Sequence, residues 1–104
     1  MKIILSTCET REDALRIADH LVAGRFAACV NILPGVTSVY PWKDKIEEAS
    51  EVLLLIKTAA EKVDETREEL KRVHPYDIPE VVTVDVEHAS QAYRDWLEKW
   101  IWQK

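Results

Sequence analysis

The longest extended segment, Lys45–Thr58, constrains the fold of this chain more than any other feature. At about 3.3 Å per residue, a strand of that length spans about 46 Å. A compact domain of about 100 residues has a radius of gyration near 13 Å and is therefore only ~34 Å across. The chain has 104 residues. A hairpin that contains this strand must therefore project beyond the body of its own domain.

The same segment carries apolar side chains on both faces. Its run Val52-Leu53-Leu54-Leu55-Ile56 lacks the alternation expected of a sheet with one face in water, and Ile3-Ile4-Leu5 and Val81-Val82 repeat the pattern. Another surface must cover the second face. Because 47% of this short chain is apolar, we interpret it as one protomer of a homo-oligomer that shares its core between copies.

The remaining patterns predict the element order βαββαβ followed by a C-terminal helix. The expected strands are Lys2–Thr7, Phe26–Trp42 with a bend at Pro34-Gly35, Lys45–Thr58 and Glu80–Val86; the expected helices are Arg11–Ala23 after an N-cap at Thr10, a helix to Val73 opened by a capping box from Thr58 to Glu61, and one capped by Ser90. This is the α+β ferredoxin-like arrangement, with two helices on one face of a four-stranded antiparallel sheet. No linker or repeat interrupts it, so residues 1–104 are expected to form a single domain.

Charge and composition narrow the range of partners. Lys and Arg number 14 against 19 Asp and Glu, a formal net charge of −5 that disfavours nucleic acids and anionic membranes. The first apolar stretch is shorter than the roughly 7–15 residues of an export signal core. Two cysteines are expected to be free thiols, and we predict a soluble, cytoplasmic protein.

The candidate metal ligands are His74, Cys29 and Cys8, whose imidazole and thiolate groups suit Cu or Zn. Their spacing matches no local metal-binding motif. Cys29, within an apolar strand, is more typical of a small buried hydrophobic residue than of a metal ligand. Cys8, at the end of a strand, is expected to be exposed and reactive.

Two interpretations compete for the loop that begins at His74. In one, Pro75 and Pro79 fix the loop, and His74 or Asp77 caps backbone groups at the helix exit. In the other, His74, Tyr76 and Asp77 line a crevice, together with Lys57 and residues of a neighbouring copy.

No catalytic pattern is visible. The hydroxyls and thiols lack an adjacent base at a recognisable spacing, and two isolated glycines rule out a Gly-rich phosphate loop. The carboxylates between Lys45 and Glu48 and between Lys62 and Arg72 are typical of solvated faces. The large side chains of Tyr40, Trp42 and Trp102 are candidates for an interface.

The motifs closely resemble those of the CutA1 family, the divalent-cation tolerance proteins. The segments that carry the resemblance are Ala27–Gly35, Tyr40-Pro41-Trp42, Lys45–Glu48 with Glu51–Thr58, His74–Glu80, and Tyr93–Leu97. They run in order from the first strand to the last helix.

The resemblance implies a cytosolic homotrimer of ferredoxin-like protomers, similar to the PII signalling proteins, without enzymatic activity or an organic cofactor. It also implies tolerance of divalent cations and binding of Cu²⁺ or a similar ion, with His74 and Cys29 at the positions of the family's histidine and cysteine. Some bacterial members have a cysteine on the first strand where Ser6 stands here, and a second histidine where Val73 stands, so Cys8 is the candidate substitute. The alternative is a PII-like small-molecule sensor or a protein-assembly module, since mammalian relatives are associated with anchoring acetylcholinesterase.

Overall fold

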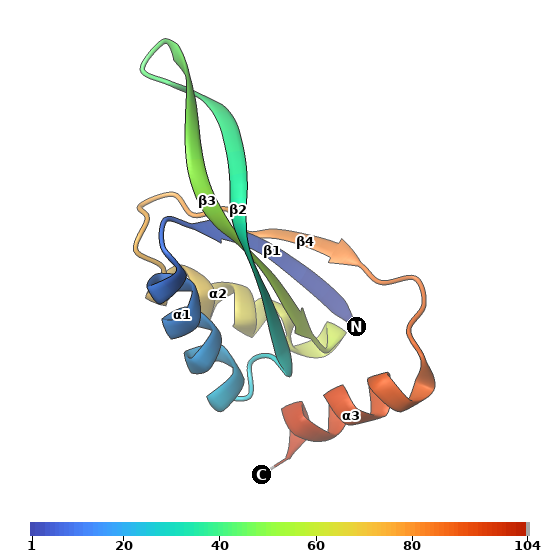
Figure 1. The fold of residues 1–104 in the computed structure, drawn as a ribbon. Helices are drawn as coiled ribbons and strands as arrows, with labels where there is room; N and C mark the ends of the chain where they lie inside the picture. Colours follow the sequence, from blue (N-terminus) through green and yellow to red (C-terminus); the bar gives the residue numbers. More distant parts are fainter. Residues whose placement is uncertain (104) are drawn as a thin grey trace.

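The computed structural model describes residues 1–103 and contains four strands and three α-helices in that range. In chain order these are β1 (Lys2–Cys8), α1 (Arg11–Ala23), β2 (Cys29–Trp42), β3 (Lys45–Thr58), the 3₁₀ turn η1 (Ala60–Lys62), α2 (Val63–Val73), β4 (Val82–Asp85) and α3 (Gln91–Trp102). The strands form one antiparallel sheet in the order β2-β3-β1-β4, with α1 and α2 on one face (Figure 1). The predicted ferredoxin-like fold is therefore confirmed.

The core lies between this sheet and the two helices. Val52, Leu54 and Ile56 of β3 are buried there, and Ile17 and Leu21 of α1 pack against them. Strand residues alternate between faces, so the side chains between the buried ones point to the opposite face of the sheet.

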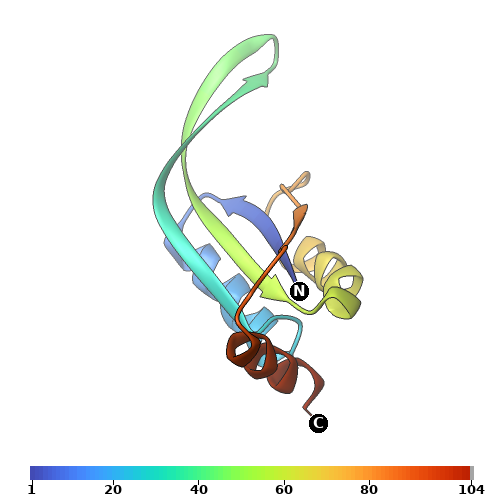
Figure 2. The same cartoon turned by 90° about the vertical axis from the view of Figure 1, so that its right-hand side faces the viewer.

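That opposite face is apolar, as the sequence predicts. Leu53 and Leu55 of β3 lie on it. Leu5 lies on β1, the strand between β3 and β4, and pairs with Leu55 on one side and with Val82 on the other. Val82 is 48% exposed and Leu33 is 41% exposed. We call this surface, which neither α1 nor α2 covers, the open face of the sheet (Figure 2).

The β2–β3 hairpin projects far beyond the rest of the molecule (Figures 1 and 2). Both of its strands have 14 residues, and the longest dimension of the molecule is 46 Å against 25 and 22 Å for the others. The predicted bend is a β-bulge between Leu33 and Val36, where Gly35 adopts a φ of 77°. The expectation that the hairpin overhangs its own domain is confirmed.

Three local predictions were wrong. Thr58 does not cap α2: it is buried at the end of β3 and its hydroxyl donates a hydrogen bond of 2.6 Å to the Phe26 carbonyl. The second strand does not begin at Phe26, because the N–H groups of Phe26 and Ala27 donate back to the Leu21 carbonyl at the end of α1, and β2 begins at Cys29. The fourth strand is also shorter than expected, since pairing with β1 covers only residues 82–85.

Helix α3 packs at the end of the sheet. Leu97 and Ile101 are buried against Ala28 and Ala59. The Trp100 indole N–H donates a hydrogen bond of 3.0 Å to the Val22 carbonyl near the end of α1. In the described part of the chain, no helix is both long and apolar enough to cross a bilayer.

Candidate functional site

A groove lies beside the β2–β3 hairpin. The hairpin forms one wall, from its base toward its tip, and the segment that follows α2 forms the opposite wall. Its charged lining residues are Glu9, Glu47, Glu51, Asp77 and Glu80, and its aromatic lining residues are Tyr40, Trp42 and Tyr76. None of the described residues that line it is basic. We call it the acidic groove.

The hairpin register explains why several of these side chains share one surface. Tyr40 pairs with Glu47, and Val36 with Glu51, and directly paired residues point to the same side of a sheet. Glu51 is two residues before Leu53, so this side of the hairpin continues the open face. The acidic groove and the apolar surface of the sheet are therefore contiguous.

Tyr76 joins the two walls of the groove. Its hydroxyl donates a hydrogen bond of 2.9 Å to the Glu51 carboxylate. Burial raises the pKa of this phenol, and the negative charge of Glu51 raises it further. Tyr76 is therefore a neutral donor at physiological pH, and it leaves the second oxygen of Glu51 available to another donor or a cation.

Both ring nitrogens of His74 are in use. The side chain is 8% exposed, and its Nε2 lies 2.8 Å from the Thr7 carbonyl, which only accepts hydrogen bonds. Nε2 therefore carries the proton, and Nδ1 accepts the Tyr76 backbone N–H at 3.1 Å. The interpretation of His74 as a cap of backbone groups is confirmed. A metal ion could bind this imidazole only after one of the two bonds breaks.

The expectation that Cys8 is exposed and reactive was wrong. The side chain is fully buried in the core beneath α1, and its Sγ donates to the Thr10 carbonyl at 3.4 Å. Burial, with Asp13 and Glu51 adding negative charge nearby, raises the pKa of the thiol to about 11. Metal binding and nucleophilic attack need the thiolate, so this thiol is poorly suited to either.

Cys29 and Lys57 lie at the other end of the sheet and pair with each other across β2 and β3. Cys29, expected to be buried, is half-buried. Cys8 pairs with Val52, five residues from Lys57, a separation of about 17 Å along the strand. Within one chain the structure therefore brings His74 and Tyr76 close to Cys8 but leaves Cys29 and Lys57 apart from them.

The interface candidates are exposed, as an interface requires. Tyr40 is 39% exposed and Trp42 is 58% exposed, and both line the acidic groove. Trp102, 48% exposed, lies instead at the end of α3, where its indole N–H donates to Glu98 at 2.6 Å. A contact with another copy stays a prediction for all three.

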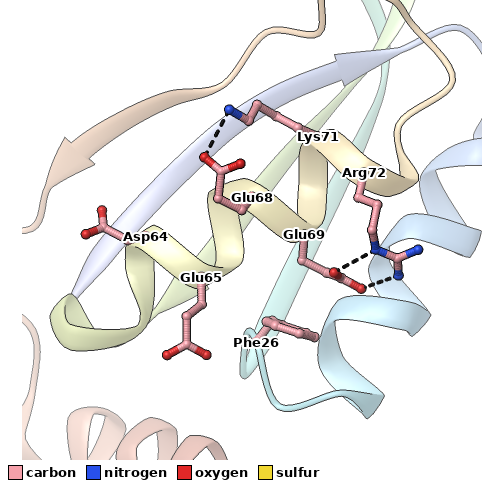
Figure 3. A pocket seen from close by; sticks show the side chains of 7 residues that line it. All are labelled: Phe26, Asp64, Glu65, Glu68, Glu69, Lys71 and Arg72. Atoms are coloured by element: carbon pink, nitrogen blue, oxygen red, sulfur yellow. Dashed lines mark hydrogen bonds and ion pairs between the residues drawn. The ribbon is translucent and has the colours of Figure 1, made fainter.

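A second, shallower hollow lies on the outer side of α2 (Figure 3). Its carboxylates are paired along the helix, Glu68 with Lys71 and Glu69 with Arg72. This is the solvated face that the sequence predicts. The acidic groove differs because its carboxylates form no ion pair with the described basic residues.

Within residues 1–103, no three His, Cys, Asp or Glu side chains converge on one point in the geometry of a closed metal site. The groove carboxylates can still attract a divalent cation and supply oxygen ligands. Sequence reasoning assigned Glu47 to a solvated face and gave no role to Glu9, Glu51 or Glu80. The sequence did contain a signal for them. Alternate residues of a strand point to the same face, so Glu51 and Glu47 lie on the same side of β3 as Leu53 and extend the open face.

Known proteins share both the sequence and the fold. The family profile described as CutA1 divalent ion tolerance protein matches residues 2–100. The divalent-cation tolerance protein CutA of Thermus thermophilus is 41% identical over 98 residues, which cover 94% of this chain and 95% of that protein. Protein CutA of Mus musculus is 44% identical over 93 residues, but this chain spans only 52% of it.

Solved structures agree. CutA from Xylella fastidiosa superimposes with a TM-score of 0.93 and 41% identity, covering 96% of each chain. A protein described as the periplasmic divalent cation tolerance protein CutA from Archaeoglobus fulgidus gives a TM-score of 0.92 at 36% identity, covering 97% of this chain and 99% of that one. By its sequence along nearly its whole length and by its fold, this chain belongs to the CutA1 family of divalent ion tolerance proteins.

Proposed function

We propose that this protein acts in divalent-cation tolerance as a cytoplasmic, PII-like homotrimer that binds Cu²⁺ or a similar ion in the acidic groove and catalyses no reaction. The observation that carries the proposal is the lining of the groove: five carboxylates and no basic side chain among the described residues. Such a surface concentrates cations. The names of the relatives agree with this role.

The carboxylates of Glu51 and Asp77 are the first ligands to test. Glu51 is held in place by Tyr76, and Asp77 is exposed on the opposite wall of the groove. Because residues 1–103 of one copy bring together no three His, Cys, Asp or Glu side chains as ligands, water or a second copy completes the coordination, and the affinity is modest. Cu²⁺ is the first ion to test because it binds nitrogen and oxygen sites more tightly than the other divalent first-row metals.

The open face supports the trimer. Leu33, Val82 and Val84 are exposed beside Leu53 and Leu55, and contiguous exposed apolar surface of this kind marks an interaction site. The projecting hairpin gives each copy a further surface beyond its own core.

Calorimetric titration with Cu²⁺ tests the metal site. Glu51→Gln and Asp77→Asn should each weaken binding several-fold, whereas Glu68→Gln on the outer face of α2 should leave it unchanged. His74→Ala tests the alternative ligand: if it abolishes binding while the two groove variants do not, the ion binds at His74 and the groove assignment is wrong. Absence of saturable binding by the wild-type protein would overturn the metal-binding proposal.

The second candidate is a PII-like small-molecule sensor or assembly module with incidental metal binding. The aromatic walls of the groove favour it, because Tyr40 and Trp42 offer apolar surface that a hydrated ion does not use. A thermal-shift screen with metabolites separates the two functions, since a ligand stabilises the folded state that it binds. A metabolite that stabilises the protein, with no response to metal ions, would reverse the order of the two candidates.

A further inference from the structure

The loop between α2 and β4 forms one wall of the acidic groove but is held by few hydrogen bonds. Pro75 and Pro79 have no backbone N–H to donate. For residues 75–80, the hydrogen bonds to other described residues are the two that Tyr76 forms, one through its N–H and one through its hydroxyl. The position of this wall therefore depends on what holds Tyr76.

His74 holds Tyr76 by its backbone and by its ring. The His74 Nδ1 accepts the Tyr76 backbone N–H at 3.1 Å. The imidazole also packs edge-on against the Tyr76 phenol, with ring centroids 4.8 Å apart. A side chain that accepts the N–H of the second residue after it closes a small turn, as Asn and Asp side chains do. One imidazole thus restrains both the backbone and the side chain of Tyr76.

His74 is in turn fixed by the regular elements on either side of it. Its backbone N–H donates to the Leu70 carbonyl at the end of α2, and its buried Nε2 donates to the Thr7 carbonyl at 2.8 Å. The pairing of β1 with β4 ends at Leu5, so His74 supplies a donor to β1 two residues beyond the last paired position. The loop consequently lies beside the end of β1 (Figure 1).

The same set of contacts reaches the proposed metal ligands. The Tyr76 hydroxyl donates at 2.9 Å to Glu51 on the opposite wall, and Asp77 follows Tyr76 directly in the chain. Hydrogen bonds from outer-shell groups orient the ligands of a metal ion and raise its affinity. A continuous path therefore leads from β1 through the imidazole and the phenol to both carboxylates.

We propose that His74 is a positioning residue of the acidic groove: without contacting the ion, it holds Tyr76 through Nδ1 and thereby places Glu51 and Asp77. The two ring nitrogens have different tasks. Nε2 secures the imidazole to the core, and Nδ1 determines the position of the loop wall. The proposal rests on the metal site proposed above.

Two amide variants separate the two bonds. His74→Asn keeps an oxygen that accepts the Tyr76 N–H, as in an Asx turn, but its side chain is too short to reach Thr7. His74→Gln keeps an N–H that donates to Thr7 but removes the acceptor for Tyr76. We expect His74→Asn to bind Cu²⁺ like the wild type and His74→Gln to bind it several-fold more weakly, because an outer-shell partner is lost. His20→Gln on α1, which removes an imidazole beside the Glu69 carboxylate, should leave binding unchanged.

A purely structural role for His74 predicts the opposite order of affinities. His74→Asn loses the buried bond to Thr7 and shortens the side chain, so its free energy of unfolding should fall below that of His74→Gln. If binding followed stability, the Asn variant would bind the ion more weakly than the Gln variant. Calorimetric titration with Cu²⁺ measures the affinities, and urea unfolding measures the stabilities.

Hydrogen exchange at the Tyr76 amide tests the positioning step without any metal. NMR should show slow exchange in the wild type and in His74→Asn, because the N–H keeps an acceptor, and faster exchange in His74→Gln.

The outcomes separate the role of His74 from the metal site. A wild type without saturable Cu²⁺ binding would overturn the metal site and, with it, this role. If the wild type binds the ion, equal affinities of the Asn and Gln variants would overturn the positioning role alone, and so would equal exchange rates of the Tyr76 amide in the two variants.

Discussion

Tyr76→Phe removes a hydrogen bond that ties the loop after α2 to the hairpin across the groove. The change deletes a hydroxyl that donates at 2.9 Å to the Glu51 carboxylate and leaves the ring, which packs edge-on against His74 with centroids 4.8 Å apart. A hydrogen bond to a charged group contributes about 1.5–3 kcal/mol. Because the pair is only partly buried, we expect a loss near the lower end, about 1.5 kcal/mol.

Thermal and chemical denaturation measure this loss. For a chain of this size, about 1.5 kcal/mol corresponds to a fall in Tm of roughly 6–12 °C. Because the proposed association of copies would also stabilise the folded state, protomer concentration must be the same in every sample. Tyr93→Phe is the matched control: the Tyr93 ring packs near the Lys57 ammonium at 5.5 Å, and its hydroxyl makes no hydrogen bond to another residue in the described range 1–103.

The two variants decide whether the reasoning holds. A fall in stability for Tyr76→Phe that is at least about 1 kcal/mol larger than that for Tyr93→Phe supports the bond across the groove. Equal effects would mean that the hydroxyl exchanges its bond with Glu51 for one with water at no cost, and the assignment of Tyr76 as the tie between loop and hairpin would be refuted.

Three further predictions follow from individual side chains. Because burial raises the pKa of Cys8 to about 11, a thiol reagent at pH 7.5 should modify Cys29 first and reach Cys8 only on unfolding; equal rates measured by mass spectrometry would contradict the burial. Glu69 has its pKa lowered from 4.5 to about 2, chiefly by hydrogen bonds from Arg72, so its contribution to stability is complete above about pH 5 and is lost as the pH falls toward 2. Glu69→Gln should therefore flatten the pH dependence of urea unfolding over that range, and an unchanged slope would show that the pair contributes nothing. Asp44→Gly relieves a left-handed backbone conformation at the hairpin tip and should raise the free energy of unfolding by about 1 kcal/mol in urea titrations; a fall would show that the Asp44 side chain stabilises the turn.

The sequence predicted the sheet, the helices and the hairpin because each follows from the spacing of apolar residues within a short segment. Runs such as Val52–Ile56 define a strand whatever surrounds it, and the length of Lys45–Thr58 alone required the overhang. The start of α2 was mispredicted because an N-cap hydroxyl at Thr58 would accept a hydrogen bond from the Glu61 backbone N–H, whereas the Thr58 hydroxyl instead donates to the Phe26 carbonyl. The Phe26 carbonyl lies 2.6 Å away across the chain, and that tertiary contact takes precedence over a local cap.

The candidate site was harder to predict because its parts come from three separate segments. Whether Cys8 is buried depends on α1 lying over the end of β1, which no residue near Cys8 determines. The pairing of Tyr76 with Glu51 joins residues 25 apart in the sequence. The sequence indicated that the loop at His74 has a specific role. Only the positions of Thr7 and Tyr76 show that both ring nitrogens of His74 form hydrogen bonds.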